Sequence, residues 1–152
     1  MQHPDYSITD FQAYLEQCRD DLNAARKKGH YFVNKLLMDY GKTLGTFPDI
    51  WKSKSNQVRG CSTNVYLNIT LVEDRVFISG HSDAELVKGQ LAILINGLNR
   101  LETNVIINHV EGLLLDFISN TQVRFSMTVN RTHSLGTLFK FIRSRVTELS
   151  GK

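Results

Sequence analysis

Residues 64–71 alternate between polar and apolar side chains, and this pattern limits the fold more than any other feature of the 152-residue chain. The apolar positions are Val65, Leu67, Ile69 and Leu71. A period of two predicts a half-buried strand. Glu73 and Asp74 then indicate a turn, and residues 76–78 continue as the partner of a hairpin. Because such a hairpin leaves one apolar face, helices must cover it, and the sequence predicts an α+β domain with a small antiparallel sheet.

Helical periodicity occupies most of the remaining chain. It predicts helices at about residues 9–29, 30–44, 82–101, 104–109, 111–119 and 134–149. The segment 82–101 is apolar around most of its circumference, so this helix should be central. Thr9–Gln12 and Ser82–Glu85 resemble N-terminal capping boxes. Residues 123–126 are consistent with a third strand or an extended segment.

The composition is that of an ordinary globular domain. With 41% hydrophobic and 22% charged residues and no domain-scale linker, residues 1–152 should form one domain. The net charge of +3 comes from scattered cations, which does not favour nucleic acid as a partner. No stretch reaches the roughly 20 apolar residues that span a bilayer, and the N-terminus lacks a secretory pattern. We therefore expect no membrane association and a cytoplasmic protein, or one of an organelle matrix if a presequence is missing.

The two cysteines lie in unlike contexts. Cys18 belongs to the apolar stripe of the first predicted helix, which predicts a buried core thiol without chemistry. Cys61 follows Arg59 and Gly60 in a polar loop just before the first strand, and this context presents a thiol rather than burying it. Two cysteines are too few for a disulfide framework, so we expect reduced thiols. No close pair of cysteines suggests a zinc or iron–sulfur site.

Three segments carry a family resemblance. They are Gln57–Leu67 (QVRGCSTNVYL), Gly80–Gly89 (GHSDAELVKG) and the pair Asn130-Arg131. Together they resemble the SufE-like sulfur acceptors, a family that includes SufE and CsdE. The likeness covers about residues 30–149, preceded by an extra N-terminal helix. It implies a SufE-like fold that is akin to the IscU scaffold.

The resemblance also implies a sulfur carrier. Cys61 matches the acceptor cysteine, whose thiol attacks the persulfide of a SufS- or CsdA-type cysteine desulfurase. The sulfur then passes to a cluster scaffold such as SufB, and the acceptor stimulates the desulfurase. No metal or organic cofactor is implied for this chain, because pyridoxal phosphate belongs to the partner. The alternative is an adaptor that binds and activates a desulfurase without carrying sulfur.

A reactive Cys61 needs help from its surroundings, because the thiolate is the nucleophile and free cysteine has a pKa of about 8.5. Arg59 is two residues away, and the family pattern implies that Arg131 comes close enough to support the thiolate. The remaining candidates, for partner binding or loop support, are Gly60, Ser62, His81, Asp83 and Lys88. Asp83 and Lys88 also have a purely structural explanation. Asp83 lies at the start of a predicted helix, where a carboxylate complements the helix dipole, and Lys88 lies within the early turns of that helix.

Three positions depart from the family pattern. Ser62 stands where glutamine is usual, Tyr66 where tryptophan is common, and Ser134 where a glycine is usual. These changes leave the acceptor thiol in place and predict a divergent member with altered desulfurase recognition.

Two other uses of the thiol are less favoured. A cysteine hydrolase would pair Cys61 with His81 or His133 as a base, but a histidine is more often a structural or surface residue. A redox sensor would form sulfenic acid at Cys61 with peroxide.

Overall fold

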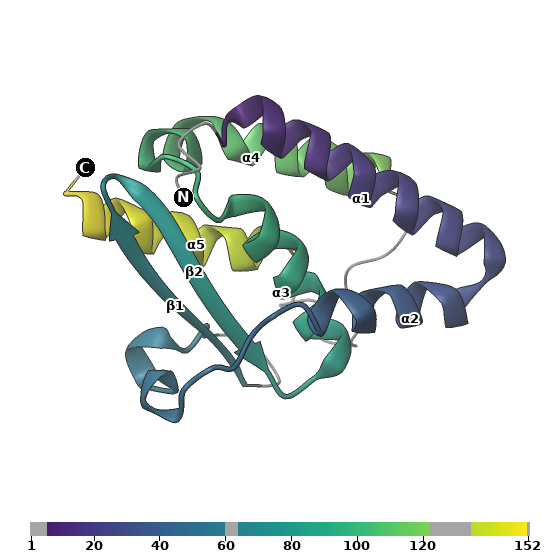
Figure 1. Cartoon of the computed structure of the whole chain (residues 1–152), viewed down its shortest axis with the longest axis horizontal. Coiled ribbons are helices and arrows are strands. Elements are labelled where there is room, and N and C mark those ends of the chain that lie inside the picture. The colour runs from purple at the N-terminus through teal and green to yellow at the C-terminus, as the bar shows by residue number, and fades with distance from the viewer. Residues whose placement is uncertain (1–5, 60–63, 122–134, 152) are drawn as a thin grey trace.

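The computed structural model describes residues 6–59, 64–121 and 135–151. In these segments five helices and one hairpin make an α+β fold, which confirms the predicted class (Figure 1). The elements are α1 (Ile8–Lys28), α2 (His30–Gly41), β1 (Val65–Val72), β2 (Arg75–Ser82), α3 (Glu85–Leu98), α4 (Thr103–Asn120) and α5 (Leu135–Ser150). Two 3₁₀ turns, η1 (Asp49–Trp51) and η2 (Lys54–Asn56), precede β1.

The hairpin has the predicted antiparallel pairing. Its register runs from Val65 opposite Ser82 to Val72 opposite Arg75. The connecting residues Glu73 and Asp74 both have positive φ, 50° and 65°. This is the conformation of a two-residue type I′ turn, whose twist matches that of the strands. Val65, Leu67 and Ile69 are buried and Leu71 is half-buried, so one face of the hairpin joins the core.

Helix α3 is central, as predicted. It packs on β2 and α2, while α5 packs on β1, and α1 and α4 lie together beyond them (Figure 1). Two glycines of α3 allow this close packing. A Cβ atom on Gly89 would collide with the backbone of Leu37 in α2, and one on Gly97 would lie 2.7 Å from the ring of Tyr14 in α1.

Both predicted capping boxes are wrong in detail. The cap of α1 is Ser7, whose hydroxyl accepts from the Asp10 N–H at 3.4 Å while the Asp10 carboxylate accepts from the Ser7 N–H at 2.8 Å. Ser82 does not cap α3, because its pairing with Val65 keeps it in β2. Its hydroxyl accepts from the N–H of Ala84, the residue that precedes the first turn of α3.

The other helices differ from prediction mainly in their bounds. The segments predicted at 104–109 and 111–119 form one continuous helix, α4, with a single buried stripe. Helix α2 ends at Gly41 rather than at Leu44. The strand considered at residues 123–126 lies outside the described residues. No helix in the described part of the chain is long and apolar enough to cross a membrane.

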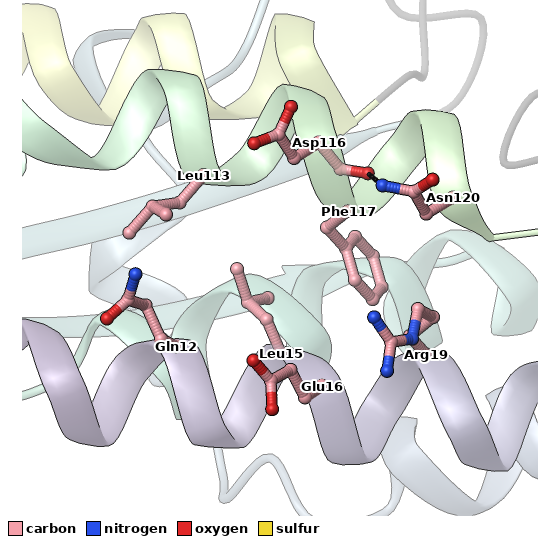
Figure 2. A pocket seen from close by; sticks show the side chains of 8 residues that line it. All are labelled: Gln12, Leu15, Glu16, Arg19, Leu113, Asp116, Phe117 and Asn120. Atoms are coloured by element: carbon pink, nitrogen blue, oxygen red, sulfur yellow. Dashed lines mark hydrogen bonds between the residues drawn. The ribbon is translucent and has the colours of Figure 1, made fainter.

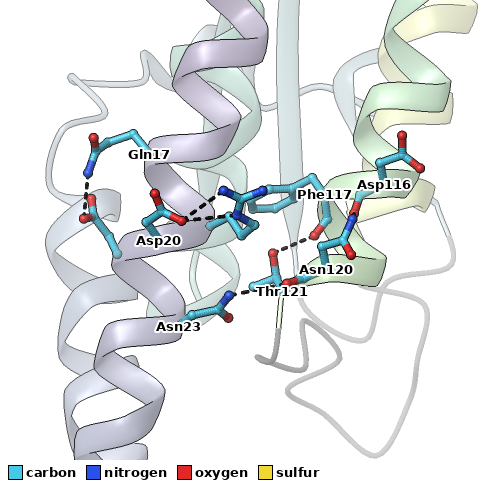
Figure 3. A network of polar contacts seen from close by, with 9 residues as sticks. Gln17, Asp20, Asn23, Asp116, Phe117, Asn120 and Thr121 are labelled. Carbon is cyan, nitrogen blue, oxygen red and sulfur yellow. Dashed lines mark hydrogen bonds and ion pairs between the residues drawn. The ribbon is translucent and has the colours of Figure 1, made fainter.

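Polar contacts fix the C-terminal end of α4 against α1 (Figure 3). The side-chain amide of Asn23 in α1 donates to the carbonyl of Asn120 at 3.3 Å. Within α4, Asn120 donates to the carbonyl of Asp116 at 2.9 Å, and Thr121 donates to that of Phe117 at 2.6 Å. The bonds to the carbonyls of Phe117 and Asn120 satisfy acceptors within the last turn of α4, where a helix leaves its carbonyls without intrahelical partners.

Candidate functional site

The residues just before the Cys61 segment are hydrogen-bonded to those just after it. The Val58 N–H donates to the Val65 carbonyl at 2.9 Å, and Gln57 forms an antiparallel bridge with Tyr66. The side-chain amide of Gln57 also donates to that of Asn64 at 3.4 Å. We call Gln57, Val58, Asn64 and Val65 the neck. It holds the two ends of residues 59–64 beside the start of β1.

Four of the predicted site residues, Gly60, Cys61, Ser62 and Arg131, lie outside the described residues. Their roles stay predictions. The same holds for Ser134, one of the departures from the family pattern, and for His133. The described structure therefore defines the site through the residues that flank and support it.

Asp83 joins the neck to the corner between β2 and α3. One carboxylate oxygen accepts from the Asn64 amide at 3.4 Å, and the other lies 3.2 Å from Nε2 of His81. The hydrogen bond from His81, followed by that from Asn64, lowers the pKa of the Asp83 carboxyl below its usual value. Two predicted support residues, His81 and Asp83, thus meet at the neck. Asp83 is not a helix cap, because Ala84 occupies that position.

An aromatic cluster also contacts His81. The ring of Phe47 stacks on His81 with centroids 6.0 Å apart and on Tyr66 at 6.3 Å. Trp51 packs edge-on against Phe47 at 5.7 Å. Phe47 is buried although it precedes Pro48 in a polar loop. The loop before η1 is thereby held against the hairpin, next to the neck.

Sequence reasoning missed Phe47, and it gave Gln57 and Asn64 no role in the site although both belong to the quoted motif. The signal for Phe47 is its large apolar ring in a mostly polar loop, because burying such a ring removes much apolar surface from water. Asn64 belongs to the family motif and to the polar face of the strand, but neither pattern predicts its contact with Asp83. Its contact with Asp83 depends on the hairpin register, which places Val65 opposite Ser82.

Lys88 and Arg59 occupy different settings. Lys88 is half-buried on α3, and its stem packs beside Gly41 of α2. This position supports a packing role rather than a place at the neck. Arg59 is exposed at the end of the described segment that leads toward Cys61, and it lines a pocket with residues of η2 and α5.

The second cysteine is excluded from the site. Cys18 is only 4% exposed inside the core, as predicted. Burial raises the pKa of its thiol, which keeps the thiol protonated at neutral pH. Since the chain has two cysteines, Cys61 is the remaining candidate for thiol chemistry.

A separate pocket of about 270 Å³ lies between α1 and α4 (Figure 2). Glu16, Arg19 and Asp116 bring charges of both signs to it, and Leu15 and Phe117 supply apolar surface. It lies away from the start of β1 (Figure 1), and no predicted site residue lines it within the described chain. We therefore do not assign it to the sulfur site.

The chain matches known proteins both in sequence and in fold. Residues 16–146 match the model of the SufE family, described as an Fe-S metabolism associated domain. An uncharacterized SufE-like protein of Synechocystis is 37% identical over 109 residues, which are 72% of this chain and 66% of that protein. SufE-like protein 1 of Arabidopsis thaliana, named as chloroplastic/mitochondrial, is 28% identical over 117 residues, 76% of this chain and 30% of that protein.

The cysteine desulfuration protein SufE of Plasmodium falciparum is 34% identical over 74 residues, 45% of this chain and 30% of that protein. The chain therefore spans about two thirds of the Synechocystis relative and under a third of the other two. The solution structure of a hypothetical protein from Thermus thermophilus shares the fold. It has a TM-score of 0.66 at 15% identity and covers 91% of this chain and 97% of that one. Because the family match extends from within α1 into α5, the chain belongs to the SufE family.

Proposed function

We propose that this protein is a sulfur acceptor. It takes sulfane sulfur from a cysteine desulfurase as a persulfide on Cys61 and passes the sulfur on for iron–sulfur cluster assembly. The observation that carries the proposal is the SufE family match across residues 16–146, which includes both the Cys61 segment and its neck. The name of the Plasmodium relative, a cysteine desulfuration protein, supports the same role.

The proposed transfer is a thiol exchange. The Cys61 thiolate attacks the outer sulfur of the desulfurase persulfide, and a new sulfur–sulfur bond forms as the bond in that persulfide breaks. The desulfurase cysteine leaves as a thiolate and takes up the proton that Cys61 released. No external oxidant or reductant is needed. A second exchange of the same kind delivers the sulfur to a scaffold such as a SufB-like protein.

The residues of this chain position and activate the thiol. Gln57, Asn64 and Asp83 hold the base of the Cys61 segment, so that it can be presented to a partner. Arg59 and Arg131 are proposed to stabilise the thiolate by their positive charge. The chain itself needs no cofactor in this scheme, because the pyridoxal phosphate that releases sulfur from cysteine belongs to the desulfurase.

The location follows from the same proposal. Desulfurase and acceptor must share a compartment, and the Arabidopsis relative is named as chloroplastic/mitochondrial. We propose that the protein acts in a cytoplasm or in an organelle matrix of that kind.

Desulfurase turnover separates a carrier from an adaptor. Alanine and sulfide production by a cysteine desulfurase are measured with the wild-type chain, Cys61→Ser and Cys18→Ala. A carrier stimulates turnover as wild type and as Cys18→Ala, but not as Cys61→Ser. Equal stimulation by Cys61→Ser would replace the carrier with an adaptor that activates the desulfurase without accepting sulfur.

A further inference from the structure

A cationic pocket adjoins the neck. It has a volume of about 390 Å³ and lies between η2, the segment that leads toward Cys61, and α5. Lys54, Arg59 and Arg145 bring three positive charges to it, and the half-buried Phe141 supplies apolar surface. Val58 also lines it but is buried in the core, with 4% of its surface exposed. Among the described residues that line it, none is a carboxylate. Its volume is within the range of ordinary ligand-binding pockets.

Arg145 builds the pocket and is itself held in place. Its guanidinium lies over the ring of Phe141 at 5.3 Å, donates to the carbonyl of Ser55 and lies 3.5 Å from the side-chain oxygen of Asn56. Glu148 pairs with it at 3.4 Å. Arg145 therefore ties η2 to α5, and part of its charge is already compensated.

Lys54 and Arg59 differ from the other cations of this region. Both are exposed, and neither has an ion-pair partner within the described part of the chain. By contrast, Lys52 pairs with Asp49 at 3.3 Å and Arg143 with Glu111 at 3.1 Å. Two uncompensated cations at one pocket create a local positive potential that attracts carboxylates.

We infer that this pocket receives an acidic segment of the desulfurase that supplies the sulfur. Carboxylates of the partner engage Lys54 and Arg59, and a neighbouring apolar side chain of the partner contacts the half-buried Phe141. Because Arg59 is two residues from Cys61, this contact positions the acceptor segment at the same time as it recognises the partner. The inference deepens the proposed function and rests on it.

The expected effect is electrostatic. Charges at the rim of an interface act mainly on the rate of association and on its salt dependence. Lys54→Glu together with Arg59→Glu should lower the association rate constant by about tenfold at low salt. The difference should shrink at high salt, where exposed charges are screened. Arg145 is left unchanged because its contacts hold η2 to α5.

The experiment measures association of the full chain with the cysteine desulfurase encoded in the same genome, by biolayer interferometry at low and at high salt. The matched control is Arg26→Glu with Lys27→Glu, which changes the net charge equally. These residues are exposed in the last turn of α1, away from η2 and the start of β1 (Figure 1). Circular dichroism melts verify that both double variants fold.

A salt-sensitive loss of about tenfold in the pocket variant, with the control within about twofold of wild type, would support the inference. Equal rates for the two variants would overturn it, as would an effect on binding of a downstream scaffold without one on the desulfurase. The proposed function is tested separately, by measuring whether Cys61 of the wild type gains a sulfur atom from the desulfurase. Sulfur gain with equal association rates would refute only the pocket, and slowed association without sulfur gain would refute only the carrier.

Discussion

The Asn64 side-chain amide donates to a carboxylate oxygen of Asp83 at 3.4 Å, although the two residues are 19 positions apart in the chain. The hairpin brings them together, because Val65 pairs with Ser82. His81 lies 3.2 Å from the other oxygen of the same carboxylate. Asp83 therefore connects the end of the Cys61 segment to the corner that precedes α3.

Asp83→Asn should loosen the neck without unfolding the domain. The substitution removes the negative charge that His81 and Asn64 share, and Asp83 is exposed. Hydrogen–deuterium exchange should rise in peptides that contain residues 57–65, while the melting temperature changes little. Asp49→Asn is the control, since Asp49 is also exposed and pairs with Lys52 outside the neck. Unchanged exchange at the neck would contradict the role given to Asp83.

The stability of the neck should fall in acid. His81 and Asn64 lower the pKa of Asp83 in the folded protein. Because this pKa is lowered on folding, the ionised Asp83 carboxylate stabilises the neck at a pH above its unfolded-state pKa of about 3.9. This stabilisation is lost as the pH falls through the folded-state pKa. Neck exchange, corrected for its intrinsic pH dependence, should increase in that window for the wild type. Asp83→Asn should lack this increase, and an identical pH profile in the variant would rule out Asp83 as its origin.

Two glycine-to-alanine substitutions should change stability in opposite directions. Gly89→Ala forces a Cβ into the backbone of Leu37, so it should cost about 1–3 kcal/mol of unfolding free energy. Gly112→Ala, on the exposed side of α4, meets nothing within 4 Å. It should stabilise the helix by about 0.5–1 kcal/mol. Urea denaturation measures both, and a neutral Gly89→Ala would contradict the close contact between α2 and α3.

Phe47→Ala should disturb the loop beside the neck. It removes the ring that stacks on His81 and Tyr66 and contacts Trp51. Truncating a buried phenylalanine costs about 3–5 kcal/mol. Because Trp51 is the chain's single tryptophan, its fluorescence should shift to the red as the ring becomes exposed. Phe47→Leu keeps apolar volume and should shift less, whereas equal spectra for all three proteins would argue against the cluster.

The two thiols should react at very different rates. Cys18 is buried and its pKa is raised, so it should not react with a thiol reagent such as dithionitrobenzoate in the native protein. Wild type should release one equivalent natively, and a second only after denaturation. Cys61→Ser should release none natively. A fast-reacting thiol in Cys61→Ser would show that Cys18 is accessible.

The hairpin and the central helix were predictable because their signals are local. Alternation fixes which face of β1 is buried, and Glu73 and Asp74 adopt the conformation of the two-residue turn that joins the strands. The start of α3 was not predictable in the same way. Ser82 and Glu85 have the spacing of a capping box, but strand pairing keeps Ser82 extended.

The candidate site was predictable in its residue types and not in its contacts. His81 and Asp83 were singled out with the segment around Cys61, and they do meet at the neck. That Asn64 joins them depends on register, and that Phe47 stacks on His81 depends on how a polar loop folds back over the hairpin. Neither contact leaves a periodic pattern in the sequence.

The central claim is that Cys61 accepts sulfur, and intact-mass spectrometry tests it most directly. The full chain is incubated with a cysteine desulfurase, pyridoxal phosphate and free cysteine, as wild type, Cys18→Ala and Cys61→Ser. We predict a gain of about 32 Da, one sulfur atom as a persulfide, in the first two proteins and not in Cys61→Ser. A gain that persists in Cys61→Ser, or no gain in the wild type while cysteine turnover rises, would contradict the account.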